Sequence, residues 1–110
     1  MKQYVIDEIR PQEQARIKEY LDRHYGPAEM GEIYWIPVEP VLYDPLQASH
    51  ADCHPLYFAV QLVPASLAAE LLVRTKSRMR CDCIRYATED QFLWFVRLLD
   101  AIFERLGIKT

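Results

Sequence analysis

Cysteine and histidine side chains, which bind soft metals and act as nucleophiles near neutral pH, are concentrated in one part of this sequence. All three cysteines and two of the three histidines fall in two short groups, His50-Ala-Asp-Cys53-His54 and Cys81-Asp-Cys83. Three thiolates with one imidazole are a ligand set of structural zinc sites. The sequence therefore contains a candidate zinc site, whose residues are Cys53, Cys81, Cys83 and either His50 or His54.

The spacing of these groups is also compatible with a purely structural role. A Cys-x-Cys pair on a regular strand chelates a metal less well than a Cys-x-x-Cys pair at a turn. A chain of 110 residues can bury enough surface to fold without zinc or disulfides. Free cysteines are most often small buried residues, and loop histidines are commonly solvated. We therefore favour a structural role for Cys81 and Cys83 and expect no cofactor, with zinc binding as the alternative.

Cys53 is the best candidate for a reactive thiol in the sequence. His50, three residues earlier, can approach Cys53 across a turn, and an imidazolium neighbour stabilises a thiolate. The adjacent His54 would point to the opposite side of an extended chain. With only three glycines, the chain cannot form a glycine-rich phosphate loop, and no spacing pairs two carboxylates across a site. The sequence thus identifies no catalytic residue and favours a protein that is not an enzyme.

Hydrophobic periodicity predicts the elements that must position these residues. Helices are expected over residues 11–25, beginning at Pro11, and from the Thr88-Glu-Asp-Gln91 capping box to Gly107. The predicted strands cover residues 3–9, 32–38, 56–63, 67–75 and 78–87. The last two of these strands would form a hairpin around Lys76-Ser77. Residues 39–55, which include three prolines, are predicted to form a long ordered loop.

The predicted fold class is α+β in two layers, formed by one domain over residues 1–110. It consists of an antiparallel or mixed sheet of about five strands with two helices on one face, in the order strand, helix, strand, long loop, three strands, helix. Cys81 and Cys83 would share one face of a strand, because side chains alternate between the faces. Their Cα atoms would then lie about 6.5–7 Å apart, too far for a relaxed disulfide.

Two regions of the chain are candidate binding surfaces. The segment 74–85 carries a net charge of +4, so the rest of the chain carries −7 of the total of −3. This overall charge disfavours nucleic-acid binding, whereas Arg74, Arg78 and Arg80 could contact an acidic protein partner. On the last predicted helix, an apolar set lies opposite the core stripe and is either covered by the long loop or used as an interface. The members of this set are Trp94, Leu98 and Ala101.

The sequence also carries expectations about location and function. The first ten residues include two acids and an arginine where a signal peptide needs an apolar run, and the longest uncharged stretch, 55–69, is shorter than the roughly 20 residues that span a bilayer. The odd number of cysteines suits a reducing compartment. We therefore expect a cytoplasmic protein without membrane contact. Its favoured function is that of a non-enzymatic interaction domain, acting as a homodimer or adaptor, and the alternative is zinc binding or thiol chemistry at the cysteine and histidine groups.

Overall fold

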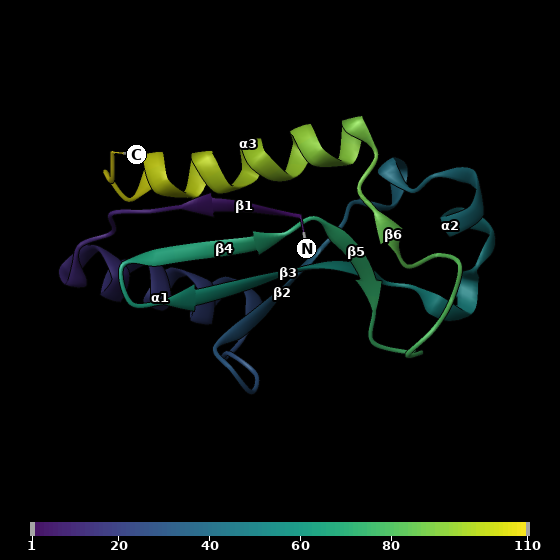
Figure 1. Cartoon of the computed structure of the whole chain (residues 1–110), viewed down its shortest axis with the longest axis horizontal. Coiled ribbons are helices and arrows are strands. Elements are labelled where there is room, and N and C mark those ends of the chain that lie inside the picture. Colours follow the sequence, from purple (N-terminus) through teal and green to yellow (C-terminus); the bar gives the residue numbers. More distant parts are fainter. Residues whose placement is uncertain (1, 110) are drawn as a thin grey trace.

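The computed structural model describes residues 2–109 and shows an antiparallel sheet accompanied by helices (Figure 1). The strands are β1 (Gln3–Ile6), β2 (Ile33–Pro37), β3 (Leu56–Val63), β4 (Ser66–Glu70), β5 (Leu72–Thr75) and β6 (Arg85–Tyr86). The α-helices are α1 (Pro11–Tyr25), α2 (Pro45–Ser49) and α3 (Glu89–Arg105), and two 3-10 turns are η1 (Pro40–Leu42) and η2 (Ala51–Cys53). Within residues 2–109, no helix has the length and apolar content needed to cross a membrane.

Strand β3 is the centre of the sheet. It pairs with β2 along one edge and with β4 and then β5 along the other, and β1 and β6 extend the sheet outward from β4 and β5. All of these pairings are antiparallel. The predicted α+β class is therefore confirmed. Figure 1 shows that the β5–β6 end of the sheet lies beside α2, whereas β1 and β4 extend toward the other end of the molecule.

The helices α1 and α3 pack on the same face of the sheet, as the sequence predicted. Strand alternation buries Phe58 on this face, and its ring stacks on that of Phe95 from α3 at 4.0 Å. Tyr34 of β2 is buried on the same face, and its hydroxyl donates a hydrogen bond to Asp22 of α1 at 2.6 Å. The core of the protein is this layer of apolar side chains between one sheet face and the two long helices.

Three predicted strands are wrong in their extent. The strand predicted over 67–75 is divided into β4 and β5, and Leu71 between them donates its N–H to the Lys2 C=O at 3.1 Å. The strand predicted over 78–87 is reduced to Arg85–Tyr86, and residues 76–84 form a loop that contains a turn closed by a bond from Ile84 N–H to Cys81 C=O at 3.0 Å. Lys76-Ser77 lacks the residues that favour a two-residue hairpin turn, so the chain makes a wide connection instead. The strand predicted over 3–9 ends at Ile6, because Glu8 adopts a left-handed φ of 61° that interrupts extended backbone.

The segment predicted as a long loop over 39–55 contains short helical elements. Helix α2 begins at a capping box in which the Asp44 carboxylate accepts from Gln47 N–H at 2.7 Å and the Gln47 side chain accepts from Asp44 N–H at 3.1 Å. Pro45 occupies the first turn, where its missing N–H costs nothing. These local bonds give the segment a defined shape and fix the position of the His50-to-His54 group that follows.

Candidate metal centre

The end of α2 places His50 and Cys53 on one turn of the chain. His50 caps the helix with its N–H on Gln47 C=O, and the 3-10 turn η2 continues directly from it. The N–H of Cys53 donates to His50 C=O at 2.9 Å. This tight turn brings two side chains that are three residues apart to the same side of the backbone.

The 76–84 loop supplies the other two thiols. Cys81 and Cys83 lie in the turn that ends at Ile84, and the N–H of Cys83 donates to the Cys81 sulfur at 3.5 Å. The prediction that both cysteines lie on a regular strand is therefore wrong. A turn allows two sulfurs separated by one residue to face the same point, which makes the pair a better chelate than the strand geometry would allow.

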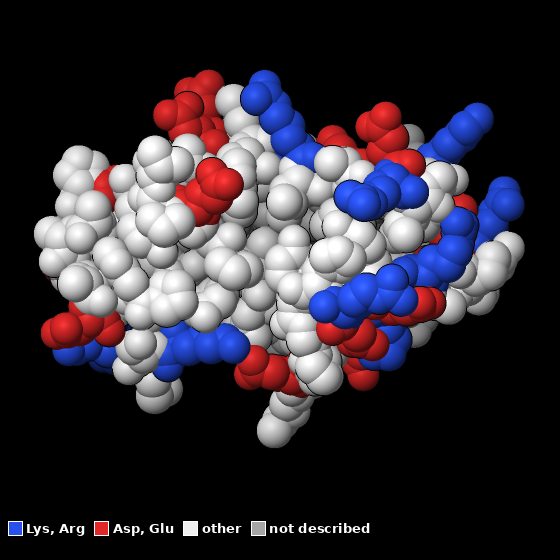
Figure 2. Space-filling view, turned by 180° about the vertical axis from the view of Figure 1, so that it is seen from behind, with Lys and Arg blue, Asp and Glu red and all other residues white. Residues whose placement is uncertain are grey.

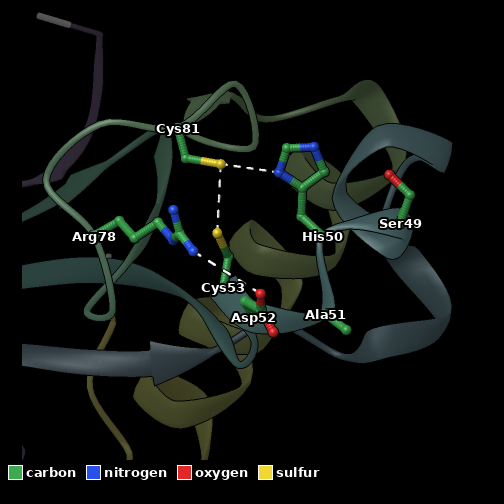
Figure 3. A pocket seen from close by; sticks show the side chains of 7 residues that line it. All are labelled: Ser49, His50, Ala51, Asp52, Cys53, Arg78 and Cys81. Carbon is green, nitrogen blue, oxygen red and sulfur yellow. Dashed lines mark hydrogen bonds and ion pairs between the residues drawn. The ribbon is translucent and has the colours of Figure 1, made fainter.

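Four donor atoms from these two segments converge. The ring Nδ1 of His50 lies 2.9 Å from the Cys81 Sγ, and the Cys53 Sγ lies 3.4 Å from the Cys81 Sγ. Figure 3 marks both contacts with dashed lines. With Cys83, the four ligand atoms all lie within 4.8 Å of one another. Ligands bound tetrahedrally at zinc distances of about 2.0–2.3 Å lie roughly 3.4–3.8 Å apart, so small side-chain movements are sufficient to coordinate an ion.

The surroundings of Cys81 and Cys83 shift the pKa values of their thiols in opposite directions. Hydrogen bonding from the backbone and side chain of Cys83, with smaller contributions from Cys53 and His50, lowers the pKa of Cys81 to about 6. Burial raises the pKa of Cys83 to about 12. All three cysteines are unbridged thiols. Hydrogen bonding thus favours the thiolate form of Cys81, whereas burial favours the protonated form of Cys83.

Buried polar groups outside the cluster hold its backbone in place. Gln47, which is fully buried, donates through Nε2 to the Cys83 C=O at 3.2 Å, and its Oε1 accepts from Gln91 Nε2 at 2.8 Å. On the other side, the Thr75 hydroxyl donates to the Cys53 C=O at 2.6 Å. A buried carbonyl without a partner is costly, so these bonds fix both cysteine-bearing segments.

His54 lies outside the donor set. Its Nε2 is 2.6 Å from the Gln47 C=O, which can only accept, and its ring lies 4.7 Å from that of Tyr43. Both loop histidines, expected to be solvated, are half-buried, and each also has a partner within the protein: His50 contacts Cys81 and His54 contacts the α2 backbone. Of the two histidines proposed as alternative ligands, the structure brings only His50 to the sulfurs within the described chain.

A cavity of about 400 Å³ opens onto the cluster (Figure 3). Its lining residues are Ser49, His50, Ala51, Asp52, Cys53, Arg78 and Cys81. Cys81 is half-buried, whereas Cys53 is only 2 % exposed and Cys83 is fully buried. Cys81 is therefore the thiol that solvent reaches most readily, although the sequence favoured Cys53 as the reactive one.

The basic residues of the 74–85 segment are largely paired with acids. Arg74 bonds to Glu70, Arg78 lies 3.9 Å from Asp52, and Arg85 lies 3.3 Å from Asp44. Lys76 binds Glu29 at 2.7 Å and lies over the rings of Trp35 and Tyr57.

Arg80 has no ion pair among residues 2–109. Figure 2 shows acidic and basic groups side by side on the face it presents. The positive segment is thus mostly neutralised within the protein.

The apolar set on α3 is only partly covered. Trp94 and Leu98 pack against the core as half-buried side chains, and the Trp94 ring stacks on Phe58 at 6.4 Å, whereas Ala101 is exposed. Beside them lies a cavity of about 440 Å³. Its lining residues are Leu42, Asp90, Leu93, Trp94, Arg97 and Leu98. Leu42 of η1 therefore contributes part of the cover that the sequence suggested, and an open hollow remains.

Comparison of the chain with protein-family models, curated proteins and solved structures finds no match.

Sequence reasoning missed the buried residues that support the cluster. The polar side chains Gln47, Gln91 and Thr75 are buried, and each makes a bond that crosses between segments. The capping box at Gln91 was recognised, but the equivalent Asp44-Pro-Leu-Gln47 pattern was not. That pattern is the one signal that could have identified α2, and nothing local indicated that its glutamine reaches Cys83.

Substituting Gln47 tests this support. In Gln47→Met, the Cys83 carbonyl and the Asp44 N–H lose their partners, so we expect the free energy of unfolding to fall by about 1–3 kcal/mol. The measurement is urea unfolding of both proteins under reducing conditions. The matched control is Gln12→Met at an exposed position of α1, which should change stability by less than about 0.5 kcal/mol. Equal stability of the two variants would contradict the role given to Gln47.

Proposed function

We propose that this protein binds one zinc ion through His50, Cys53, Cys81 and Cys83. The observation that carries the proposal is the convergence of these four donors within 4.8 Å, although the donors of one segment lie 28 to 33 residues from those of the other. The ion would join the 76–84 loop to the end of α2. The chain would then act as a small domain whose β6 end is held in shape by metal.

The chemistry of the donors supports zinc over harder cations. Thiolate and imidazole ligands suit zinc, whereas magnesium and calcium require oxygen ligands. Four protein ligands also complete a tetrahedral shell and leave no open position for substrate, which is the arrangement of structural zinc sites. The burial of Cys53 and Cys83 favours the same role, because it protects two of the thiolates from solvent.

Hydrogen bonds to the sulfur of Cys81 and to the backbone of Cys83 would hold the ligands of such an ion in position. The N–H of Cys83 donates to the Cys81 sulfur, and Gln47 fixes the Cys83 carbonyl. Outer groups of this kind orient ligands and typically change metal affinity by about 10–100-fold when they are removed. They also order the loop in advance, so that less of the binding free energy is lost in fixing its backbone.

Zinc binding by the untagged protein tests the proposal. We expect one zinc per chain by native mass spectrometry and elemental analysis. In Cys81→Ser and in His50→Gln, competition with a chromophoric chelator should show an affinity loss of at least about 100-fold, since a first ligand matters more than its outer partners.

The matched control is His54→Gln, which removes the neighbouring histidine and should leave zinc affinity within about threefold of the wild type, because that ring is bonded elsewhere. Circular dichroism verifies that each variant is folded. A wild-type chain that binds no zinc would sink the proposal, and so would a loss in His54→Gln as large as that in His50→Gln.

A second candidate function, self-association through α3, is supported by the charges at the rim of its apolar hollow. Asp90 and Arg97 lie seven residues apart on this helix and line the same hollow as Trp94 and Leu98. If two copies met with antiparallel α3 helices, a two-fold axis would place Asp90 of one copy opposite Arg97 of the other. The arrangement would bury Leu93, which is 38 % exposed.

A charge-swap series measures this association. Asp90→Arg alone should weaken the dimer at least about tenfold in sedimentation, because like charges would then face each other. The double variant Asp90→Arg with Arg97→Asp should restore the dimer, since the two charges of the intermolecular ion pair are exchanged and still attract each other. A wild-type chain that stays monomeric at high concentration would contradict the proposal, as would a double variant no tighter than the single one.

A further inference from the structure

We propose that Cys53 and Cys81 are a redox pair, oxidised by a peroxide to a disulfide that expels the metal. The inference deepens the zinc function proposed above and rests on it for the metal, whereas the pairing of the two sulfurs rests on their geometry alone. It would make the cluster a site of reversible oxidative modification.

The distance between the sulfurs favours this pair. The Sγ atoms of Cys53 and Cys81 lie 3.4 Å apart, and a disulfide requires about 2.0 Å, so closure needs a movement of roughly 1.4 Å. Cys81 lies in a loop without regular secondary structure, where the backbone is free of ladder hydrogen bonds that would resist such a shift. Cys83 is held more firmly, because its carbonyl accepts from the fully buried Gln47 of α2, whereas the Cys81 carbonyl accepts from Ile84 within its own turn.

Access to the cluster determines which sulfur meets an oxidant first. Both Cys81 and Cys53 line the cavity that opens onto the cluster, but Cys81 is half-buried, whereas Cys53 is only 2 % exposed. Cys83 is fully buried. Hydrogen peroxide is small enough to enter a cavity of about 400 Å³. Cys81 is therefore the attacked residue, and the buried Cys53 beside it is the resolving one.

The reaction proceeds in two balanced steps. The Cys81 thiolate attacks one oxygen of hydrogen peroxide, the O–O bond breaks, and the second oxygen leaves as hydroxide and takes up a proton to give water. The Cys53 thiolate then attacks the sulfenic sulfur of Cys81, the S–S bond forms, and the S–O bond breaks to release a second hydroxide that is likewise protonated. The two thiolates supply both electrons that reduce the peroxide.

The consequence for the metal follows from the ligand count. Oxidation removes two of the four ligands, leaving His50 and Cys83, and two ligands do not retain zinc as four do. The disulfide nevertheless joins the same two segments that the ion joined. Oxidation would thus exchange one cross-link for another, releasing the metal while the loop stays attached to the end of α2.

Peroxide treatment of the zinc-loaded and of the metal-free full chain tests the inference. In the loaded chain, we expect one zinc ion to be released for each disulfide formed. The absorbance of a chromophoric chelator measures this release. Zinc binding should recover after the disulfide is reduced with a thiol. Non-reducing peptide mapping should identify the Cys53–Cys81 bridge in both forms. Cys83→Ser, which keeps the pair, should still form the bridge, and Cys81→Ser should form none.

The two arms separate this inference from the zinc function. If the chain binds no zinc but the metal-free form still makes the Cys53–Cys81 bridge, the redox pair stands and the zinc proposal fails. If zinc binds but peroxide yields a bridge to Cys83, or oxidised Cys81 without any bridge, the redox pair is overturned and the zinc proposal stands.

Discussion

The contact between Cys81 and the turn that carries His50 and Cys53 is the interaction on which one end of this molecule depends. The rest of the protein is held by the burial of apolar side chains between the sheet and the two long helices, with Phe58 and Phe95 stacked at its centre. The 76–84 loop contributes only Cys83 to this buried core, with Cys81 and Ile84 packed partly against it. It is attached through its thiols, through the Cys83 carbonyl on Gln47 and through the ion pair of Lys76 with Glu29.

A group of three thiols and an imidazole is an unusual way to close a loop by itself. Hydrogen bonds to sulfur are weak, and the burial of Cys83 raises its pKa, so the cluster gains little without a cation. A zinc ion bound as proposed would change this balance, because it would deprotonate the thiols and replace weak contacts with coordinate bonds. The buried pair Gln47 and Gln91 then has a clear purpose, since it links the Cys83 carbonyl to the start of α3 and keeps the ligands aimed at one point.

The parts of the fold that sequence predicted are those specified by local pattern. Helix 11–25 and strand 56–63 follow from apolar periodicity, and the capping box at Thr88 marks the start of α3. The loop at 76–84 could not be predicted in this way, because it depends on a turn at Cys81–Ile84 and on partners far along the chain. Sequence also could not tell which histidine lies beside the sulfurs. That depends on the three-dimensional arrangement, in which the His54 ring is bonded to the α2 backbone. Composition identified the donor types of the candidate site, and only the three-dimensional arrangement brought them together.

X-ray absorption at the zinc edge of the loaded, untagged protein tests the central claim most directly, because it reports the atoms bound to the metal. Coordination by His50 and the three cysteines predicts a first shell of three sulfurs at about 2.3 Å and one nitrogen at about 2.0–2.1 Å. A first shell made only of nitrogen and oxygen atoms would contradict the account, because it would place the ion away from the cluster.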